Sequence, residues 1–166
     1  MEKQFTRCQL TWLVVLRIFI GWHFLYEGLI KVMNPGWSAK AYLIDSKGLF
    51  GPMFNSIAAN SGLLKCIDFM NEWGLILIGL GLILGLFARL SSIGGVILLL
   101  LYTMSHPSLL SVTYTMPFEG SYFLIDKNLV ELAALGVLFF FPSAREIGID
   151  RFLINVLPSG FKKFII

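Results

Sequence analysis

The longest apolar segment of the chain restricts its fold more than any other feature. It runs for 32 residues from Trp73 to Met104, and its only charged residue is Arg89, which stands close to two serines. One membrane span takes about 20 apolar residues, so this segment is too long for a single straight span. We therefore interpret it as a tight hairpin of two helices, with Arg89 at a turn that faces water.

Two more segments have the length of a membrane span. The first runs from Leu10 to Ile30, which is about 31 Å of helix at roughly 1.5 Å per residue. Basic residues precede it as in a signal peptide, but no small-residue cleavage site follows, so we expect a retained first helix. The last span lies within 122–141 and stops at Pro142, which cannot continue a helix.

The composition agrees with a membrane protein and excludes several other classes. Of the 166 residues, 57% are apolar and 14% are charged, whereas a soluble domain carries about 25% charged residues. A soluble domain of this size could not bury so much apolar surface. The net charge of +3 comes from scattered basic residues, so no nucleic-acid partner is expected. Cys8 and Cys66 form no CxxC motif and are expected on opposite sides of the membrane, so no redox dithiol is predicted.

The mixed segment between the first two spans is expected to cap the bundle on the outer side of the membrane. Two short amphipathic helices are predicted in it, around 38–44 and 54–70. Trp37, Tyr42 and Trp73 suit a membrane–water interface. With both termini in the cytoplasm, the inner segments carry seven Lys and Arg residues and the longer outer segments five, in keeping with the positive-inside rule.

These features together predict an all-α, polytopic membrane protein, a four-helix bundle with an extracytoplasmic amphipathic cap between helices one and two. We expect a single integral membrane domain over residues 1–166, in which the second helix begins before Trp73, within 63–72. The expected location is the cell inner membrane, multi-pass, with both termini cytoplasmic. The expected spans are about 10–30, 73–88, 90–105 and 122–141, with the cap at about 36–70 and a cytoplasmic tail at 142–166.

The first helix concentrates the ionisable groups that lie within a span. At about 100° per residue, Arg17, Glu27 and Lys31 share one face with two glycines, and His23 lies at its edge. Charges inside a span normally face a bundle interior or a wet cavity and pair with other groups. Arg17 and Glu27 are ten residues apart, about 15 Å along the helix, so each needs its own partner. For Arg17 we expect hydroxyls of the third helix, helix-end carbonyls or a bound lipid.

Partners for Glu27 are expected near the outer boundary of the membrane. Carboxylates that meet in a partly dry site resist simultaneous ionisation, which suits proton exchange. An alternative holds for Asn128 and Glu131, which have the spacing of a capping box and would then only satisfy N–H groups at a helix start. His106, followed by a proline, has the alternative of a plain helix end. The residues expected to converge on Glu27 are Lys31, Glu72, His106, Lys127 and Glu131.

The candidate site therefore has two groups of residues, and either it is functional or the cluster only fixes the bundle. The candidate catalytic, proton-exchanging residues are His23, Glu27 and Glu131. The candidate binding residues are Arg17, Lys31, Glu72, Trp73, His106, Lys127 and Asn128. Only the two histidines could ligate haem, and neither a haem nor a metal site is expected. The glycines of the second span are interpreted as packing residues, with Gly81-xxx-Gly85 at the contact spacing of membrane helices.

Several segments carry a recognisable pattern. The longest are 16–31, LRIFIGWHFLYEGLIK, and 73–86, WGLILIGLGLILGL, the second followed by Ala88-Arg89. The shorter ones are Ser105-His106-Pro107, Glu119-Gly120-Ser121-Tyr122, Lys127-Asn128-Leu129-Val130-Glu131 and Gly148-Ile149-Asp150-Arg151. In this order they resemble the DoxX-like family of membrane proteins, and most closely its DoxD-type branch, the small membrane subunit of thiosulfate:quinone oxidoreductase.

The resemblance implies a four-helix membrane bundle with a redox association and quinone contact, without assigning catalytic residues. We therefore expect a membrane subunit of a redox system, with quinone-linked oxidation of thiosulfate or a related small sulfur compound as the reaction. If the chain is an enzyme, it is then a quinone-linked oxidoreductase subunit. Its expected partners are the lipid bilayer, a quinone, and a second redox subunit or further copies of itself. The alternative is a non-catalytic scaffold or assembly subunit for a redox or envelope partner.

Overall fold

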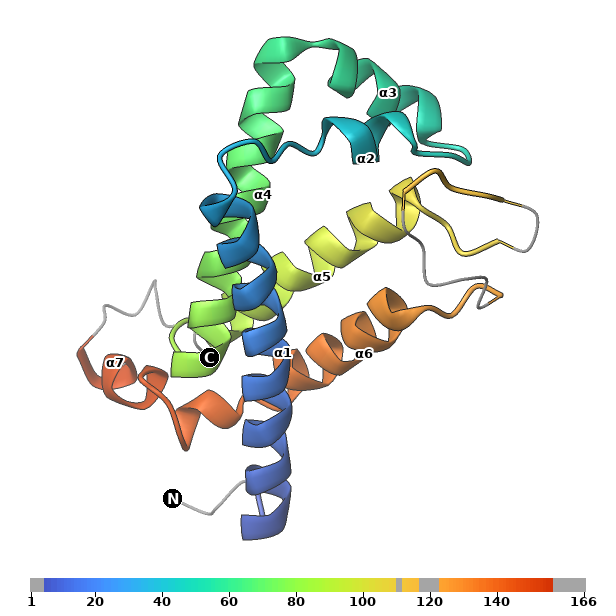
Figure 1. The fold of residues 1–166 in the computed structure, drawn as a ribbon. Coiled ribbons are helices and arrows are strands. Elements are labelled where there is room, and N and C mark those ends of the chain that lie inside the picture. Colours follow the sequence, from blue (N-terminus) through green and yellow to red (C-terminus); the bar gives the residue numbers. More distant parts are fainter. Residues whose placement is uncertain (1–4, 110–111, 117–122, 157–166) are drawn as a thin grey trace.

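The computed structural model describes residues 5–109, 112–116 and 123–156, and every regular element in these ranges is helical (Figure 1). The all-α fold class predicted from the sequence is therefore confirmed. In chain order the elements are α1 (Arg7–Met33), α2 (Lys40–Ile44), α3 (Gly51–Ala59), α4 (Ser61–Leu84), α5 (Ala88–Ser105), α6 (Lys127–Phe140), the 3-10 helix η1 (Ser143–Arg145) and α7 (Asp150–Val156).

Among the described residues, three helices are long and apolar enough to cross a membrane, namely α1, α4 and α5. This confirms that the chain has the character of a membrane protein. Helix α6 lies within the predicted fourth span, 122–141, but it has only 14 residues, or about 21 Å of helix, against a hydrocarbon core of about 30 Å. The arrangement with four spans and the outer position of the cap stay predictions.

The helices pack in two pairs. Helices α1 and α4 run side by side, and α5 and α6 form a second pair that crosses them obliquely (Figure 1). The backbones of α1 and α4 touch, because a Cβ atom added at Gly79 would lie 2.7 Å from the carbonyl oxygen of Gly21. The sequence predicted such a helix contact for a different pair, Gly81 and Gly85. A Cβ atom at Gly81 would instead collide with Ser91 of α5, and one at Gly85 would lie 2.9 Å from Gly148 in the C-terminal segment.

A single apolar core joins these four helices. Its fully buried members include Leu82 of α4 and Leu135 of α6, which have no exposed surface. Tight burial at these positions fixes how the two pairs cross, because cores of this density tolerate little change in volume. The buried residues of the core are Ile20, Phe24, Leu75, Leu82, Leu99, Leu135 and Leu138.

The segment between α1 and α4, residues 34–60, folds into a small separate layer that we call the cap. Helices α2 and α3 bury Leu43 and Phe54 against each other, and Met104 near the end of α5 packs on the same cluster. The cap is also tied to α4, because the Asp68 carboxylate accepts hydrogen bonds from the Ser38 hydroxyl and the Ala39 amide, both at 2.8 Å. The cap therefore sits over the ends of α4 and α5, at the top of Figure 1.

The second amphipathic helix expected in the cap, over 54–70, is divided in the structure. Helix α3 ends at Ala59, and Asn60 then starts α4 by accepting hydrogen bonds from the amides of Gly62 and Leu63. An asparagine in this position satisfies N–H groups that a helix start leaves free. Helix α4 therefore begins at Ser61, ahead of the expected 63–72. Of the span expected at 73–88, residues 73–84 form the second half of α4, and the rest belongs to the turn and the start of α5.

At the opposite end of the bundle, the C-terminal segment closes the turn between α4 and α5. The break falls at residues 85–87, before the expected Ala88–Ser92, and Gly85 and Phe87 take left-handed backbone conformations with φ of 63° and 48°. The buried Asp150 carboxylate accepts hydrogen bonds from the amides of Phe87 and Ala88 at 2.7 and 3.0 Å. Asp150 thus caps α5 from a distant part of the sequence. Residues 157–166 of the expected cytoplasmic tail lie outside the described residues.

Candidate functional site

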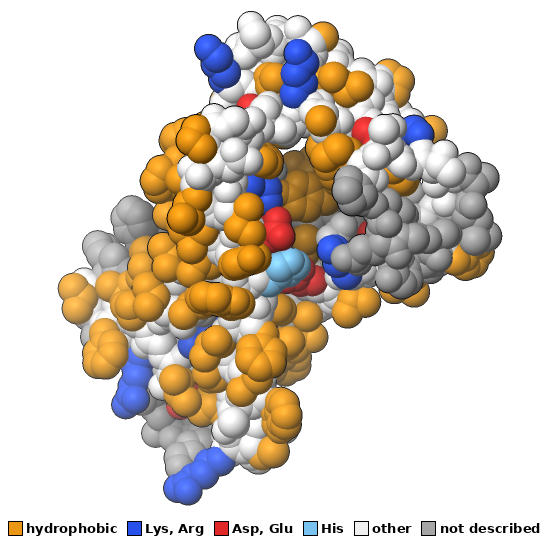
Figure 2. Space-filling model, viewed as in Figure 1, with side chains coloured by type: hydrophobic (Ala, Val, Ile, Leu, Met, Phe, Trp, Pro, Cys, Tyr) orange, Lys and Arg blue, Asp and Glu red, His pale blue; other side chains and the backbone are white. Residues whose placement is uncertain are grey.

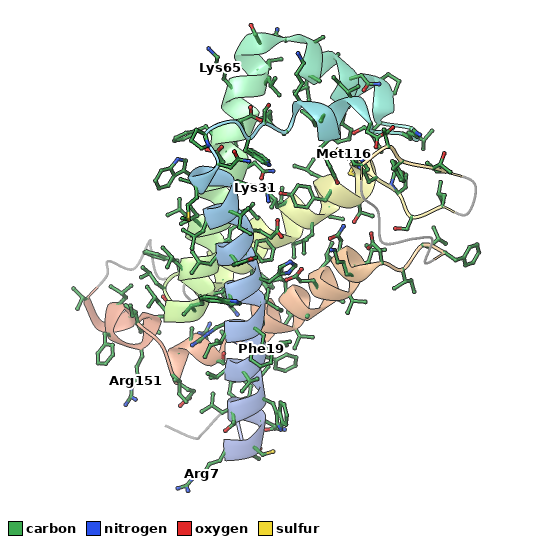
Figure 3. All side chains as sticks on the ribbon, viewed as in Figure 1. Arg7, Phe19, Lys31, Lys65, Met116 and Arg151 are labelled. Atoms are coloured by element: carbon green, nitrogen blue, oxygen red, sulfur yellow. The ribbon has the colours of Figure 1, made fainter. Side chains whose placement is uncertain are left out.

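A cavity of about 470 Å³ lies between the cap and the helices α1, α4, α5 and α6, and we call it the capped cavity. Figure 2 shows it as a hollow with a histidine and with acidic and basic side chains at its rim. Lys31 of α1 and Met116 of the segment after α5, both labelled in Figure 3, belong to its lining. By contrast Phe19, labelled on the same helix, is 70% exposed and lies outside the lining.

Most of the predicted site residues meet in this cavity. Two of the three proposed proton-exchanging groups pair across α1 and α6, where His23 Nδ1 lies 3.0 Å from Glu131 Oε1 and 3.1 Å from Oε2. The third, Glu27, pairs one turn along α1 with Lys31, whose Nζ lies 2.7 Å from Glu27 Oε2. The predicted residues that line the cavity are His23, Glu27, Lys31, His106, Lys127, Asn128 and Glu131.

The capping-box alternative for Asn128 and Glu131 is wrong. The N-cap of α6 is Asp126, whose carboxylate accepts a hydrogen bond from the Leu129 amide at 3.0 Å. Because Asp126 already satisfies this helix start, the Glu131 carboxylate is left for His23. The side chain of Glu131 is only 11% exposed, so its charge is largely shielded from water and needs such a partner.

The opposite wall of the cavity is aromatic and centres on His106. This ring stacks on Tyr42, with centroids 3.8 Å apart, and on its other side approaches Tyr114, with centroids 4.6 Å apart. Burial lowers the pKa of His106 to about 4, so the ring is neutral at pH 7. Burial likewise raises the pKa of Tyr42, so its phenol stays protonated.

A chain of hydrogen bonds through two serine hydroxyls holds the His106 ring. Ser46 donates its hydroxyl proton to the Tyr42 carbonyl, and it also hydrogen-bonds to the Ser105 hydroxyl. The Ser105 hydroxyl in turn hydrogen-bonds to His106 Nδ1, which lies 3.0 Å away. His106 Nε2 is buried without a hydrogen-bond partner among the described residues.

A second buried polar atom without a partner lines the same cavity. Asn71 of α4 donates its amide N–H to the Tyr102 hydroxyl at 2.8 Å, while its Oδ1 atom is buried and has no partner among the described residues. Buried polar atoms are nearly always hydrogen-bonded in folded proteins, so two such atoms in one cavity indicate a site for a polar ligand group. Asn71 stands between Asp68 and Glu72 in the polar half of α4, so nothing in the sequence set it apart.

The segment after α5 completes the cavity and is held by the cap. Asp45 accepts hydrogen bonds from the amides of Thr115 and Met116 at 2.7 and 2.9 Å. Burial opposes the charge on Asp45, but these hydrogen bonds and nearby Lys47 outweigh it and lower its pKa. Tyr114 is fixed in turn by a hydrogen bond from its hydroxyl to the Pro107 carbonyl. No motif in the sequence pointed to Tyr114, because its position depends on these long-range contacts.

Three predicted site residues do not reach the capped cavity. Arg17 is buried at the other end of α1, where it donates to the Ile147 carbonyl at 2.8 Å and to the Ser143 hydroxyl at 3.4 Å. Of the partners expected for it, a carbonyl near a helix end is present and a hydroxyl of the third helix is not. Glu72 and Trp73 lie on α4 outside the cavity lining.

The fold and the cavity define the class of this protein. Over the described ranges it is an all-α chain with three helices of membrane-spanning length, and its capped, aromatic cavity is bordered by a histidine–carboxylate pair and a lysine–carboxylate pair. No protein-family model, no curated protein and no solved structure matches the chain.

Proposed function

We propose that this chain is the quinone-binding membrane subunit of a redox system. The observation that carries the proposal is the capped cavity, in which a stacked aromatic wall faces a wall of paired acidic and basic groups. Its volume of about 470 Å³ falls within the range of about 300–1,000 Å³ that is typical of small-molecule sites. A quinone headgroup is flat and apolar, with oxygens at its edge, and so matches such a lining.

In quinone reduction, the two walls of the capped cavity would have different roles. Reduction of a quinone to a quinol takes up two electrons and two protons, one proton for each oxygen. The His23–Glu131 and Glu27–Lys31 pairs are suited to supply the protons, because each holds a proton between a carboxylate and a nitrogen beside the cavity. The unpartnered polar atoms on His106 and Asn71 are suited to form hydrogen bonds with the oxygens of the quinone or quinol.

The electrons come from a donor outside the described residues in this proposal. The resemblance to thiosulfate:quinone oxidoreductase implies thiosulfate or a related small sulfur compound, acting directly or through a second redox subunit. The proposed setting is the cell inner membrane, with both termini cytoplasmic and α6 as the fourth span. The cap and the cavity then face the outer side of the membrane.

Binding of a short-tailed quinone to the full chain in lipid nanodiscs tests the proposal. Trp37 lines the cavity, so a bound quinone is expected to quench tryptophan fluorescence in a saturable way. Glu131→Gln and Glu27→Gln are then expected to lower the rate of quinol formation with thiosulfate at least tenfold, a typical contribution of a proton-transfer group being about 10²–10⁴-fold. Glu72→Gln is the matched control, since this carboxylate lies on α4 outside the cavity lining.

The outcomes separate the two proposed functions. If the chain binds quinone saturably but Glu27→Gln and Glu131→Gln keep the wild-type rate of quinol formation, the cavity is a quinone site without the proposed proton exchange. Absence of saturable quinone binding refutes the quinone proposal. A stable polypeptide that then co-purifies favours the non-catalytic scaffold, for which the observation is the exposed aromatic face of α1. This face carries Trp12, Phe19, Trp22 and Tyr26.

A further inference from the structure

A second hollow, separate from the capped cavity, lies in the outer surface of the α5–α6 pair. It measures about 240 Å³ and shares no lining residue with the capped cavity. Its lining is apolar except for the buried Ser92, and a Cβ atom added at Gly136 would meet nothing within 4 Å. We call it the α5–α6 groove. Its lining residues are Ser92, Ile93, Val96, Ile97, Gly136 and Phe139.

One end of the groove is positively charged. Arg89 lies one helical turn before Ile93 on α5, and its guanidinium group stands 5.4 Å from the centre of the Phe139 ring. Helical spacing places Arg89, Ile93 and Ile97 in one row about 12 Å long, because each residue adds about 1.5 Å. The groove therefore combines a cationic end with an apolar length along the helix.

In the part of the chain that the structure describes, no carboxylate pairs with Arg89. Its Nε atom is buried without a hydrogen-bond partner among the same residues. Arg145 lies close enough for mutual repulsion, since burial and the Arg89 charge both lower its pKa. The Asp150 carboxylate accepts hydrogen bonds from the Phe87 and Ala88 amides, and its charge interacts with Arg145 and Arg17.

We propose that the α5–α6 groove binds an anionic phospholipid, with its phosphate at Arg89 and one acyl chain along Ile93 and Ile97. A guanidinium group offers paired N–H donors that match a phosphate. The apolar length suits an acyl chain better than a polypeptide, which would bring backbone groups that the groove cannot satisfy. Arg89 stands at the end of a span, which is the depth of lipid headgroups.

Lipid retention by the full chain in detergent tests this proposal, measured by native mass spectrometry. The probes are phosphatidylglycerol and phosphatidylcholine with identical acyl chains. The wild-type chain is expected to retain phosphatidylglycerol about fivefold better, which is the usual effect of one basic residue beside an anionic lipid surface. Arg89→Gln is expected to abolish this preference. Arg151→Gln, which removes an exposed arginine of α7, is the matched control and should leave the preference unchanged.

A second variant tests the apolar part of the groove. Gly136→Leu fills open space without a clash at Cβ, so it should fold and lower the retention of both lipids alike. Equal retention of the two lipids by the wild-type chain overturns the proposal. Equal losses in Arg89→Gln and Arg151→Gln also overturn it, because the preference would then be a general effect of surface charge. A co-purifying polypeptide displaced by Gly136→Leu would show a protein partner in the groove instead.

Discussion

Replacing Gly79 by alanine tests the contact on which the capped cavity depends. A Cβ atom there would lie 2.5 Å from the Leu25 amide nitrogen and 2.7 Å from the Gly21 carbonyl oxygen. Ordinary contacts are about 3.5–4.0 Å, so α1 and α4 must separate by about 1 Å, and overpacking of this kind costs about 1–3 kcal/mol. Alanine also gains about 0.5–1 kcal/mol over glycine within a helix.

A matched control isolates the clash. Gly74 lies on the same helix, and a Cβ atom there would meet nothing within 4 Å, so Gly74→Ala carries only the helical gain. The free energy of unfolding of Gly79→Ala should therefore lie about 1–3 kcal/mol below that of Gly74→Ala. Reversible unfolding in mixed micelles, followed by tryptophan fluorescence, measures both values. Equal stabilities would refute the assignment of Gly79 to the α1–α4 contact.

Three other predictions concern the remaining parts of the fold. Burial holds the pKa of His106 at about 4, against 6.5 in the open chain. As the pH falls from 6.5 to 4, the unfolded state therefore takes up the proton before the folded state does. In this window the cap should lose about 1.4 kcal/mol of stability per pH unit, and above it none. Hydrogen exchange in α2 and α3 measures this loss, and His106→Gln should remove the pH dependence. Arg17→Leu should release the segment 143–156 to proteolysis and cost about 1.5–3 kcal/mol, the usual value of hydrogen bonds from a charged group, while Arg7→Leu should do neither. In a chain whose two native cysteines are replaced by serine, cysteines at Lys40 and Lys47 should be labelled from outside and one at Lys162 from inside; labelling of all three from one side would contradict the proposed topology.

The sequence was sufficient where the signal is local. The apolar segments predicted three helices that the structure contains, and the proline at position 142 marked the end of α6. Helical spacing alone placed Glu27 and Lys31 on one face of the first helix with His23 at its edge, and these three residues do line one cavity. Periodicity within one helix is enough for such predictions, because a helix fixes the relative directions of its own side chains.

The parts that the sequence did not predict depend on contacts between distant residues. Asp150 caps α5 across more than 60 residues, and Asp45 holds the amides of Thr115 and Met116 across 70. No spacing rule connects such pairs, since each depends on how the chain returns after several intervening helices. The division of the expected 54–70 helix, by contrast, could have been predicted from the sequence, because Asn60 is a typical capping residue.

The position of a charge along a helix decides its role as much as the face on which it lies. Arg17 and Glu27 share a face of α1, yet they are ten residues apart and meet different neighbours. Arg17 reaches the segment after α6, which also supplies the carboxylate that caps α5, so its contacts hold the closed end of the bundle. Glu27 lies among the groups of the capped cavity, where a binding site is proposed. One polar face of a single helix thus serves packing at one end and the candidate site at the other. Because the two ends are separate, a substitution at Arg17 changes the packing contacts of the bundle but not the lining of the capped cavity.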